Sequence, residues 1–231
     1  MYKVLVTGGS SGIGAAIAGQ LRVAGHEVIT CARSEGADIR CDVTNRNEVE
    51  QMKLQIAPID VLVNNVGGAA TSPFVKMTEE AWDWHFQLNV KSAFYCTQAF
   101  LPSMLERKWG RIINIASTAG KIGGRYISAY VAAKHAVIGM TRALALEVAD
   151  KNVTVNAVCP SFVDTPMLRQ SAEMIARTTN KATEEIMDNF RHRNPQHRFI
   201  SVEDVAATVR FLIETPSING QAISLCGGET V

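Results

Sequence analysis

Short apolar runs alternate with longer segments of helical periodicity along almost the whole chain. The runs are continuously apolar, which is typical of strands buried on both faces of a parallel sheet. We predict strands at 2–6, 26–31, 38–43, 59–64, 111–116, 153–158 and 222–225. The predicted helices are 14–24, 44–56, 79–106 with a break near Asn89, 126–149, 167–191 and 202–214. This alternation predicts an α/β fold, a doubly wound parallel sheet of about seven strands of the Rossmann type.

The repeating pattern has no linker and no shift in composition, so we predict one dinucleotide-binding and catalytic domain over residues 1–231. Only six residues separate Cys31 from Asp38. A helical crossover takes a dozen or more, so the connection between the second and third strands is predicted to be shortened. The segment 166–200 is polar and irregular, and we predict a lid over the substrate there.

Composition excludes several classes of function. The formal net charge is +1, so no basic field for nucleic acid and no polybasic patch for a membrane is visible. The five cysteines are scattered without C-x-x-C spacing, which argues against a disulfide framework or a metal site. The chain starts without a signal-peptide pattern, and its apolar runs are too short to span a membrane. We expect a cytoplasmic protein.

The first strand is followed by T-G-G-S-S-G-I-G at 7–14. Gly8 can adopt a backbone conformation closed to other residues. Gly12 lets the main chain approach a pyrophosphate, and Gly14 lets the next helix pack close to the strand. The helix N-terminus then offers free N–H groups to phosphates. A plain glycine-rich turn is the alternative.

The residue after the second strand distinguishes the two nicotinamide dinucleotides. A carboxylate there would bind both ribose hydroxyls of NAD, but this chain has Ala32, Arg33 and Ser34. A guanidinium beside a hydroxyl suits a 2′-phosphate, so we predict a preference for NADP(H), with NAD(H) possible. A solvated surface arginine is the alternative. Asp42, before Val43, could accept a bond from the adenine amino group or cap the following helix.

Tyr130 and Lys134 are four residues apart in a predicted helix and therefore share one face. A free phenol has a pKa of about 10 and is a poor acid or base near neutrality. We expect the neighbouring ammonium and an oxidised nicotinamide to lower that pKa. The alternative is a half-buried tyrosine next to an exposed lysine.

Six segments in this order resemble the single-domain branch of the short-chain dehydrogenase/reductase family, over essentially the whole chain. They are the glycine turn 7–14, N-N-V-G at 64–67, L-N-V around Asn89, N-I-A-S-T-A-G around Ser117, the Y-x-x-x-K motif of Tyr130 and Lys134, and the turn Pro160-Ser161. Val66 stands where the family has alanine. Ser161 stands where it has glycine, so that turn must avoid a strongly positive φ or bear strain.

The resemblance implies a catalytic set of Asn89, Ser117, Tyr130 and Lys134, with Tyr130 as the proton donor. Ser117 would hold the substrate oxygen, Lys134 the nicotinamide ribose, and Asn89 a water leading to Lys134. It also implies a homotetramer. The predicted cofactor contacts are Gly8, Ser10, Ser11, Gly12, Ile13, Gly14, Arg33, Ser34, Asp42, Val43, Asn65, Gly67, Tyr130, Lys134, Val163 and Thr165.

Several segments are similar to 3-oxoacyl-thioester reductases and aromatic polyketide ketoreductases. This similarity implies reduction of a ketone to a secondary alcohol, on a substrate that acyl carrier protein or coenzyme A could carry. Lys121, Arg125 and Arg169 could meet the carrier's phosphate, although ordinary surface charge is the alternative for each. Two other functions stay open: an NAD-dependent dehydrogenase of small cyclic or secondary alcohols, and a non-catalytic nucleotide sensor or scaffold on the same fold.

Overall fold

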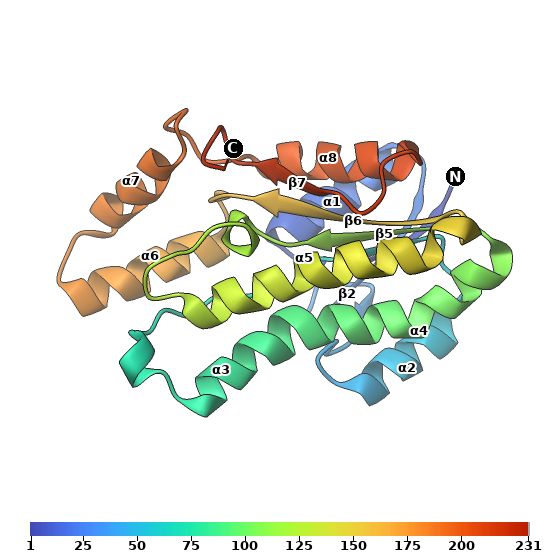
Figure 1. The fold of residues 1–231 in the computed structure, drawn as a ribbon, viewed down its shortest axis with the longest axis horizontal. Coiled ribbons are helices and arrows are strands. Elements are labelled where there is room, and N and C mark those ends of the chain that lie inside the picture. The colour runs from blue at the N-terminus through green and yellow to red at the C-terminus, as the bar shows by residue number, and fades with distance from the viewer. Residues whose placement is uncertain (231) are drawn as a thin grey trace.

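The computed structural model describes residues 1–230 and contains one parallel sheet of seven strands in the order β3-β2-β1-β4-β5-β6-β7 (Figure 1). The strands are β1 Lys3–Thr7, β2 Glu27–Ala32, β3 Ile39–Arg40, β4 Val61–Asn64, β5 Gly110–Ile115, β6 Val153–Pro160 and β7 Ala222–Leu225. The strand order reverses between β1 and β4. In open sheets of this kind, ligands bind outside the carboxyl ends of the strands at that point.

Helices cover both faces of the sheet (Figure 1). They are α1 Gly12–Val23, α2 Arg46–Ile56, α3 Glu79–Phe86, α4 Ser92–Arg107, α5 Ser128–Val148, α6 Pro166–Thr179, α7 Thr183–Arg193 and α8 Val202–Glu214. Val4 and Val6 of β1 pack in the core beneath α1 and α8, whereas Leu5 packs in the core beneath α2, α4 and α5. Successive strand residues face opposite sides, so a strand between two helical layers must be apolar throughout. The predicted Rossmann-type fold is confirmed.

The helix boundaries follow local chemistry. Gly25, at φ +86°, ends the first helical segment as expected. The hydroxyls of Thr78, Thr165 and Ser201 cap α3, α6 and α8 by accepting backbone N–H bonds. The predicted break near Asn89 is a π-helical turn, Gln87–Lys91, that joins α3 to α4. Such turns are often found at functional sites.

The shortened connection between β2 and β3 is confirmed, but β3 is only two residues long. The predicted strand 38–43 is therefore too long. The carboxylate of Asp38 turns back to accept bonds from the backbone and hydroxyl of Thr30, at 2.8 and 2.7 Å, and from Arg22 at 2.8 Å. At the other end Asp42 bonds the backbone and hydroxyl of Thr44 in a turn.

The single helix predicted at 167–191 is two helices, α6 and α7. Asn180, in the left-handed conformation at φ +54°, ends α6. The two helices form a hairpin that projects away from the sheet (Figure 1). Of the two alternatives at Ser161, the turn takes the first: Ser161 is not among the residues with positive φ. Its N–H bonds the Leu225 carbonyl at 2.9 Å.

Within residues 1–230, no helix combines the length and the hydropathy needed to cross a membrane.

Candidate active site

The glycine turn requires its glycines. Gly8 and Gly12 have φ of +66° and +53°, which side chains disfavour. A Cβ on Gly14 would lie 2.2 Å from the Gly8 carbonyl oxygen. No side chain caps the first amides of α1: Ser11 stands at the N-cap position without a side-chain bond. The turn therefore presents backbone N–H groups at a helix N-terminus, which is the arrangement that holds a pyrophosphate.

Asn65 holds this turn from the neighbouring strand. Its Nδ2 donates to the carbonyls of Thr7 and Gly8, at 3.0 and 3.2 Å, and its own N–H donates to Thr7 Oγ1 at 3.0 Å. The side-chain amide predicted to touch the cofactor is thus engaged in fixing the phosphate turn. This explains why an asparagine follows β4 at this place.

Four predicted cofactor residues meet at the carboxyl ends of β2 and β3. Ser10 Oγ and Ser34 Oγ lie 3.0 Å apart, which joins the phosphate turn to the end of β2. Arg33 has a side chain that is 72% exposed, and its Nη1 lies 3.9 Å from Asp42 Oδ2. An exposed pair at that distance contributes about 0–1 kcal/mol, so the guanidinium is free to turn toward a phosphate.

Lys134 forms the floor of the site. It is 4% exposed, and its Nζ donates to the Ile115 carbonyl at the end of β5, at 3.0 Å. A Cβ on Gly67 would lie 2.8 Å from Asn89 Oδ1 and 3.2 Å from Lys134 Nζ, so only glycine fits between these two side chains. Burial lowers the pKa of Lys134 from 10.5 to about 8, because the charged form is desolvated.

Tyr130 lies one turn earlier on α5, with Lys134 Nζ 5.7 Å from its ring centroid. Burial raises the pKa of the Tyr130 phenol, and its interaction with the Ser117 side chain acts in the opposite direction. The protein itself therefore does not produce the expected lowering of that pKa. Desolvation of the phenolate raises the pKa by more than the Ser117 side chain lowers it. The phenol is held in its protonated form.

Ser117 has a structural role as well. Its Oγ accepts the Ala119 N–H at 3.1 Å and so caps the 3-10 turn Thr118–Gly120. A hydroxyl that accepts one bond still has its own proton to donate. Tyr130 and Ser117 therefore offer two neighbouring O–H donors to one acceptor atom.

Asn89 is 2% exposed in the π-helical turn and binds the loop that follows β4. Its Oδ1 accepts the Gly68 N–H at 3.1 Å, and its Nδ2 donates to the Gly68 and His85 carbonyls, both at 2.9 Å. Both amide protons are used within the protein. A water held by Asn89 would have to donate to an oxygen of this residue.

His85 is a buried residue of this region that sequence reasoning missed. Its ring lies 6.5 Å from the Tyr130 ring, centroid to centroid, and is 2% exposed. The available signal was its spacing: His85 precedes Asn89 by four residues and so shares its helix face.

The loop after β6 lies against the phosphate turn. A Cβ on Gly12 would lie 3.5 Å from the Thr165 methyl group, and the Thr165 hydroxyl caps α6. Val163 is buried and bridges to Ile200. Val43 is buried in the core beneath α2, so its side chain is a packing residue.

Two of the three cations proposed for a carrier phosphate have partners within the protein. Lys121 Nζ donates to the Ala222 carbonyl and, at 2.8 Å, to Ser224 Oγ, so it ties its loop to β7. Arg169 pairs with Asp164 through two bonds of 3.2 and 3.1 Å. Arg125 is exposed. The Lys121 ammonium is held at the edge strand β7 by these bonds, which favours the alternative to a phosphate contact.

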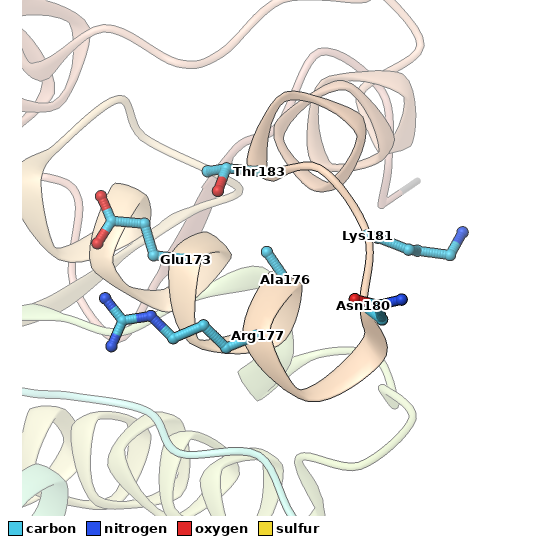
Figure 2. A pocket seen from close by; sticks show the side chains of 6 residues that line it. All are labelled: Glu173, Ala176, Arg177, Asn180, Lys181 and Thr183. Atoms are coloured by element: carbon cyan, nitrogen blue, oxygen red, sulfur yellow. The ribbon is translucent and has the colours of Figure 1, made fainter.

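The hairpin of α6 and α7 packs mainly on itself, through Ala172, Ala176 and Ile186. An open cavity of about 510 Å³ lies between the two helices, and Arg177 and Lys181 on its rim point away from one another (Figure 2). Because these two cations diverge, the cavity does not offer a pair of positive charges to one ligand.

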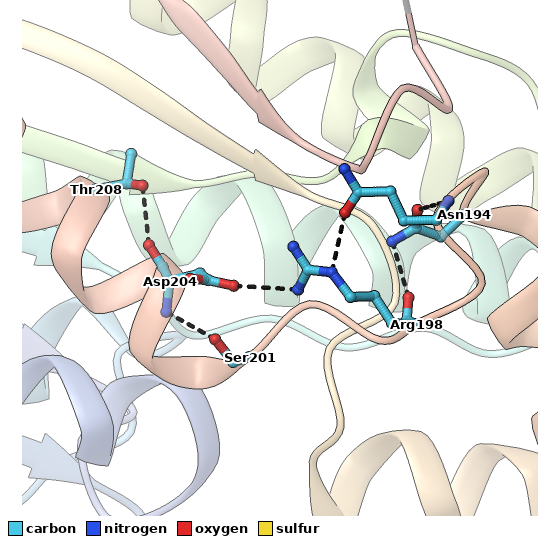
Figure 3. Close-up of polar contacts among 6 residues, drawn as sticks. Asn194, Arg198, Ser201, Asp204 and Thr208 are labelled. Carbon is cyan, nitrogen blue, oxygen red and sulfur yellow. Dashed lines mark hydrogen bonds and ion pairs between the residues drawn. The ribbon is translucent and has the colours of Figure 1, made fainter.

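The far end of the hairpin is fastened to the sheet. Glu229, whose side chain is 8% exposed, pairs with Arg193 at 3.3 Å and accepts a bond from Ser161 Oγ. The segment that follows α7 is also hydrogen-bonded to α8: Arg198 reaches Asp204, whose N–H is bonded by Ser201 Oγ (Figure 3). Ser161, unusual for its position, thus belongs to an anchor of the hairpin.

The chain matches the family described as short chain dehydrogenase over residues 2–176. It is 34% identical to the D-β-hydroxybutyrate dehydrogenase of Rhizobium meliloti, covering 98% of this chain and 97% of that protein. It is also 34% identical to a 3-oxoacyl-acyl-carrier-protein reductase of Staphylococcus epidermidis, covering 98% of each. A variant of actinorhodin polyketide ketoreductase, solved with NADPH, superposes with a TM-score of 0.93 at 37% identity, covering 99% of this chain and 97% of that one.

Proposed function

The chain belongs to the short-chain dehydrogenase family. From this premise we propose that it is an NADP(H)-dependent reductase of a ketone, of the class of 3-oxoacyl thioesters or polyketide-like carbonyls. The observation that carries the proposal is the junction of β5 and α5. There two O–H donors, Tyr130 and Ser117, stand beside a buried ammonium, Lys134.

The cofactor fits the residues that are present. The glycine turn and the N-terminus of α1 would hold the pyrophosphate, and Arg33 with Ser34 would hold a 2′-phosphate. NADPH, when bound, supplies the hydride for the carbonyl carbon. The solved relative that contains NADPH supports this preference.

The side chains account for the proton. Burial keeps the Tyr130 phenol protonated, which is the form that an acid must have when a ketone is reduced. Tyr130 gives its proton to the carbonyl oxygen while Ser117 donates a hydrogen bond to the same atom. The Lys134 ammonium, close to the phenol, stabilises the phenolate that remains. Asn89 fixes Gly68 next to this floor.

The substrate class rests on the relatives. The two relatives are named for substrates that carry oxygen on carbon 3 of an acyl chain. One is named for a 3-hydroxy acid and the other for a 3-oxoacyl group. The similarity to the 3-oxoacyl-acyl-carrier-protein reductase supports a substrate whose acyl chain is carried by acyl carrier protein or coenzyme A. The dehydrogenase relative favours a second candidate, oxidation of a free 3-hydroxy acid, which uses the same residues in the reverse direction.

A non-catalytic sensor on this fold would not need two hydroxyl donors beside a buried lysine. This set of side chains supports an enzyme over a scaffold.

The assembly is a further part of the proposal. A homotetramer is expected from the family resemblance, and the exposed apolar side chains of Phe94 on α4 and Leu146 on α5, 41% and 82% exposed, support contact through these helices.

The experiment that tests the proposed chemistry compares the wild type with Tyr130→Phe. The variant removes the proton donor and leaves the ring in place. We expect reduction of acetoacetyl-coenzyme A by NADPH to fall by about 10²–10⁴-fold, which is the usual contribution of a general acid. The dissociation constant for NADPH, measured by fluorescence titration, should change little. A variant that keeps the wild-type rate would overturn the assignment of Tyr130.

A further inference from the structure

The loop 68–72, which follows the N-N-V-G segment, is held at alternate amides by three different elements. The Gly68 N–H bonds Asn89 in the π-helical turn at 3.1 Å. The Ala70 N–H bonds His85 Nε2 of α3 at 3.1 Å. The Ser72 N–H bonds the carbonyl of Tyr126, ahead of α5, at 2.8 Å. The middle attachment is the only one of these three that a titratable side chain makes.

The partners of the His85 ring determine its tautomer. A backbone N–H can only donate, so Nε2, which faces Ala70, carries no proton. Nδ1 lies 2.8 Å from the Ala81 carbonyl, which can only accept, so Nδ1 carries the proton. His85 is therefore a neutral imidazole with both nitrogens engaged. A proton on Nε2 would face the Ala70 N–H and break the bond.

The same ring contacts the residue that we assign as the acid. Tyr130 lies edge-on to His85, with 6.5 Å between centroids and 62° between planes. Trp84 also packs against the imidazole, with 4.8 Å between ring centroids and 85° between ring planes. Because neither nitrogen is free, His85 cannot relay a proton to Tyr130, and its effect on the phenol has to be steric.

We propose that His85 is a positioning residue of the reaction: as a neutral imidazole it holds loop 68–72 through Ala70 and supports the ring of Tyr130 at the same time. The inference rests on the proposed function, because it gives the loop the role of a wall beside the reacting carbonyl. Small displacements of such a wall have large effects on rate: about 1 Å can lower it about 10²-fold.

Three substitutions separate the hydrogen bond from the volume. His85→Gln places an amide oxygen at about the reach of Nε2 and can accept the Ala70 N–H. His85→Asn is polar but one methylene too short, and His85→Leu is apolar. We expect kcat/KM for acetoacetyl-coenzyme A with NADPH to fall about tenfold in the Asn and Leu variants and to be largely restored in the Gln variant, with the dissociation constant of NADPH unchanged.

The matched control is His135→Leu. His135 is exposed on α5, and its ring bonds only its own helix, at the Val131 carbonyl. This variant should keep the wild-type kcat/KM. A role of His85 in stability alone would lower the melting temperature of the Leu variant without changing its kcat/KM at 25 °C. That result, or equal losses in the Gln and Leu variants, would overturn the proposal.

Two measurements do not depend on activity, and the first of them needs only the wild type. Nitrogen-15 NMR of the imidazole should show a protonated Nδ1 and an unprotonated Nε2, and the Ala70 amide should exchange its hydrogen about tenfold more slowly than in His85→Leu. An Nε2-protonated ring in the wild type would contradict the geometry even if every variant failed to fold. An Ala70 amide that exchanges equally fast in the wild type and in folded His85→Leu would contradict it as well. If the tautomer and exchange agree but the wild type reduces no 3-oxo thioester, the proposed function fails and the attachment of the loop stands.

Discussion

The Lys134 ammonium is buried with a backbone carbonyl, that of Ile115, as its hydrogen-bond partner. Burial lowers its pKa to about 8, against about 10.4 in an unfolded chain. The folded state thus disfavours the proton. Below pH 8 the lysine is charged in both the folded and the unfolded state, and its burial destabilises the folded state to the full extent. It is relieved as the pH rises from about 8 to about 10.4, because the unfolded state then binds more protons than the folded one.

Removing this charge should therefore stabilise the fold while it abolishes the reaction. We expect Lys134→Met to raise the free energy of unfolding of the cofactor-free protein at pH 7 by about 2 kcal/mol. This is the cost of desolvating the ammonium minus the contribution of the hydrogen bond that the variant loses. The gain should shrink steadily between pH 8 and pH 10. Urea unfolding of both proteins at several pH values measures it. A gain independent of pH, or a loss at pH 7, would show that Lys134 is not destabilising.

We propose that the choice of cofactor depends on Arg33. Arg33→Ala should weaken NADPH about 10–100-fold, since a charge-assisted bond to phosphate contributes about 1.5–3 kcal/mol. NADH has no 2′-phosphate and should bind within about twofold of the wild type. Fluorescence titration gives both constants, with Arg125→Ala as the control. Equal weakening of both cofactors would mean that Arg33 supports the fold of the site rather than the phosphate.

The sequence motifs bring together residues whose neighbours could not be predicted from them. Gly67 is explained only once Asn89 and Lys134 are seen on either side of it. For Lys121 the sequence left a carrier phosphate and ordinary surface charge open, and neither indicates its partners about a hundred residues away on β7. His85 was missed because its spacing from Asn89 indicates a shared helix face but not the loop or the ring that it contacts. Side-chain partners across the fold depend on packing, which periodicity does not contain.

At the scale of elements, the α6–α7 hairpin has a small core of its own and is joined to the sheet mainly at its ends. Glu229 connects Arg193 at the end of α7 to Ser161 after β6. The same end is stiffened by Asn194, which is 2% exposed and lies so close to the turn after β7 that a Cβ on Gly227 would be 2.0 Å from its Oδ1. A lid that moves would have to pivot between these attachments.

Weakening the anchor should loosen the hairpin without changing the chemistry. Glu229→Gln keeps a bond to Ser161 but removes the charge paired with Arg193. We expect backbone amides of α7 to exchange about fivefold faster, corresponding to about 1 kcal/mol for an ion pair whose arginine is half-exposed. KM for the substrate should rise by a similar factor while kcat changes little. Glu184→Gln, an exposed acid on the same helix, is the control. Unchanged exchange in the Glu229 variant would show that the pair does not restrain the hairpin.

The elements that could be predicted well are those whose pattern is set by burial. The strands of the sheet interior and the amphipathic helices on its faces lie close to their predicted positions. The two that were wrong depend on single polar residues. Asn180 ends α6 by taking the left-handed conformation, and Asp38 turns its carboxylate back to Thr30 and shortens β3. Such choices between competing local bonds leave little trace in hydrophobic periodicity.

For the molecule as a whole, the order of the strands gathers segments far apart in the chain at one edge of the sheet. The glycine turn after β1, the loop after β4, Ser117 after β5 and the loop after β6 all follow carboxyl ends of parallel strands. The alternation of strands and helices predicted this gathering, because parallel strands joined by right-handed crossovers place all their carboxyl ends together. The tetramer stays a prediction, since contacts between copies are not encoded in that alternation.

We propose that this edge of the sheet reduces a 3-oxoacyl group with NADPH. The measurement that tests it most directly follows the loss of reduced-nicotinamide absorbance on acetoacetyl-coenzyme A, with NADPH and NADH in parallel. We predict turnover with NADPH at a kcat/KM at least about tenfold above that with NADH, the minimum expected from one charge-assisted contact at Arg33. Absence of turnover with either cofactor, in a protein that oxidises secondary alcohols or 3-hydroxy acids with NAD⁺, would contradict the account.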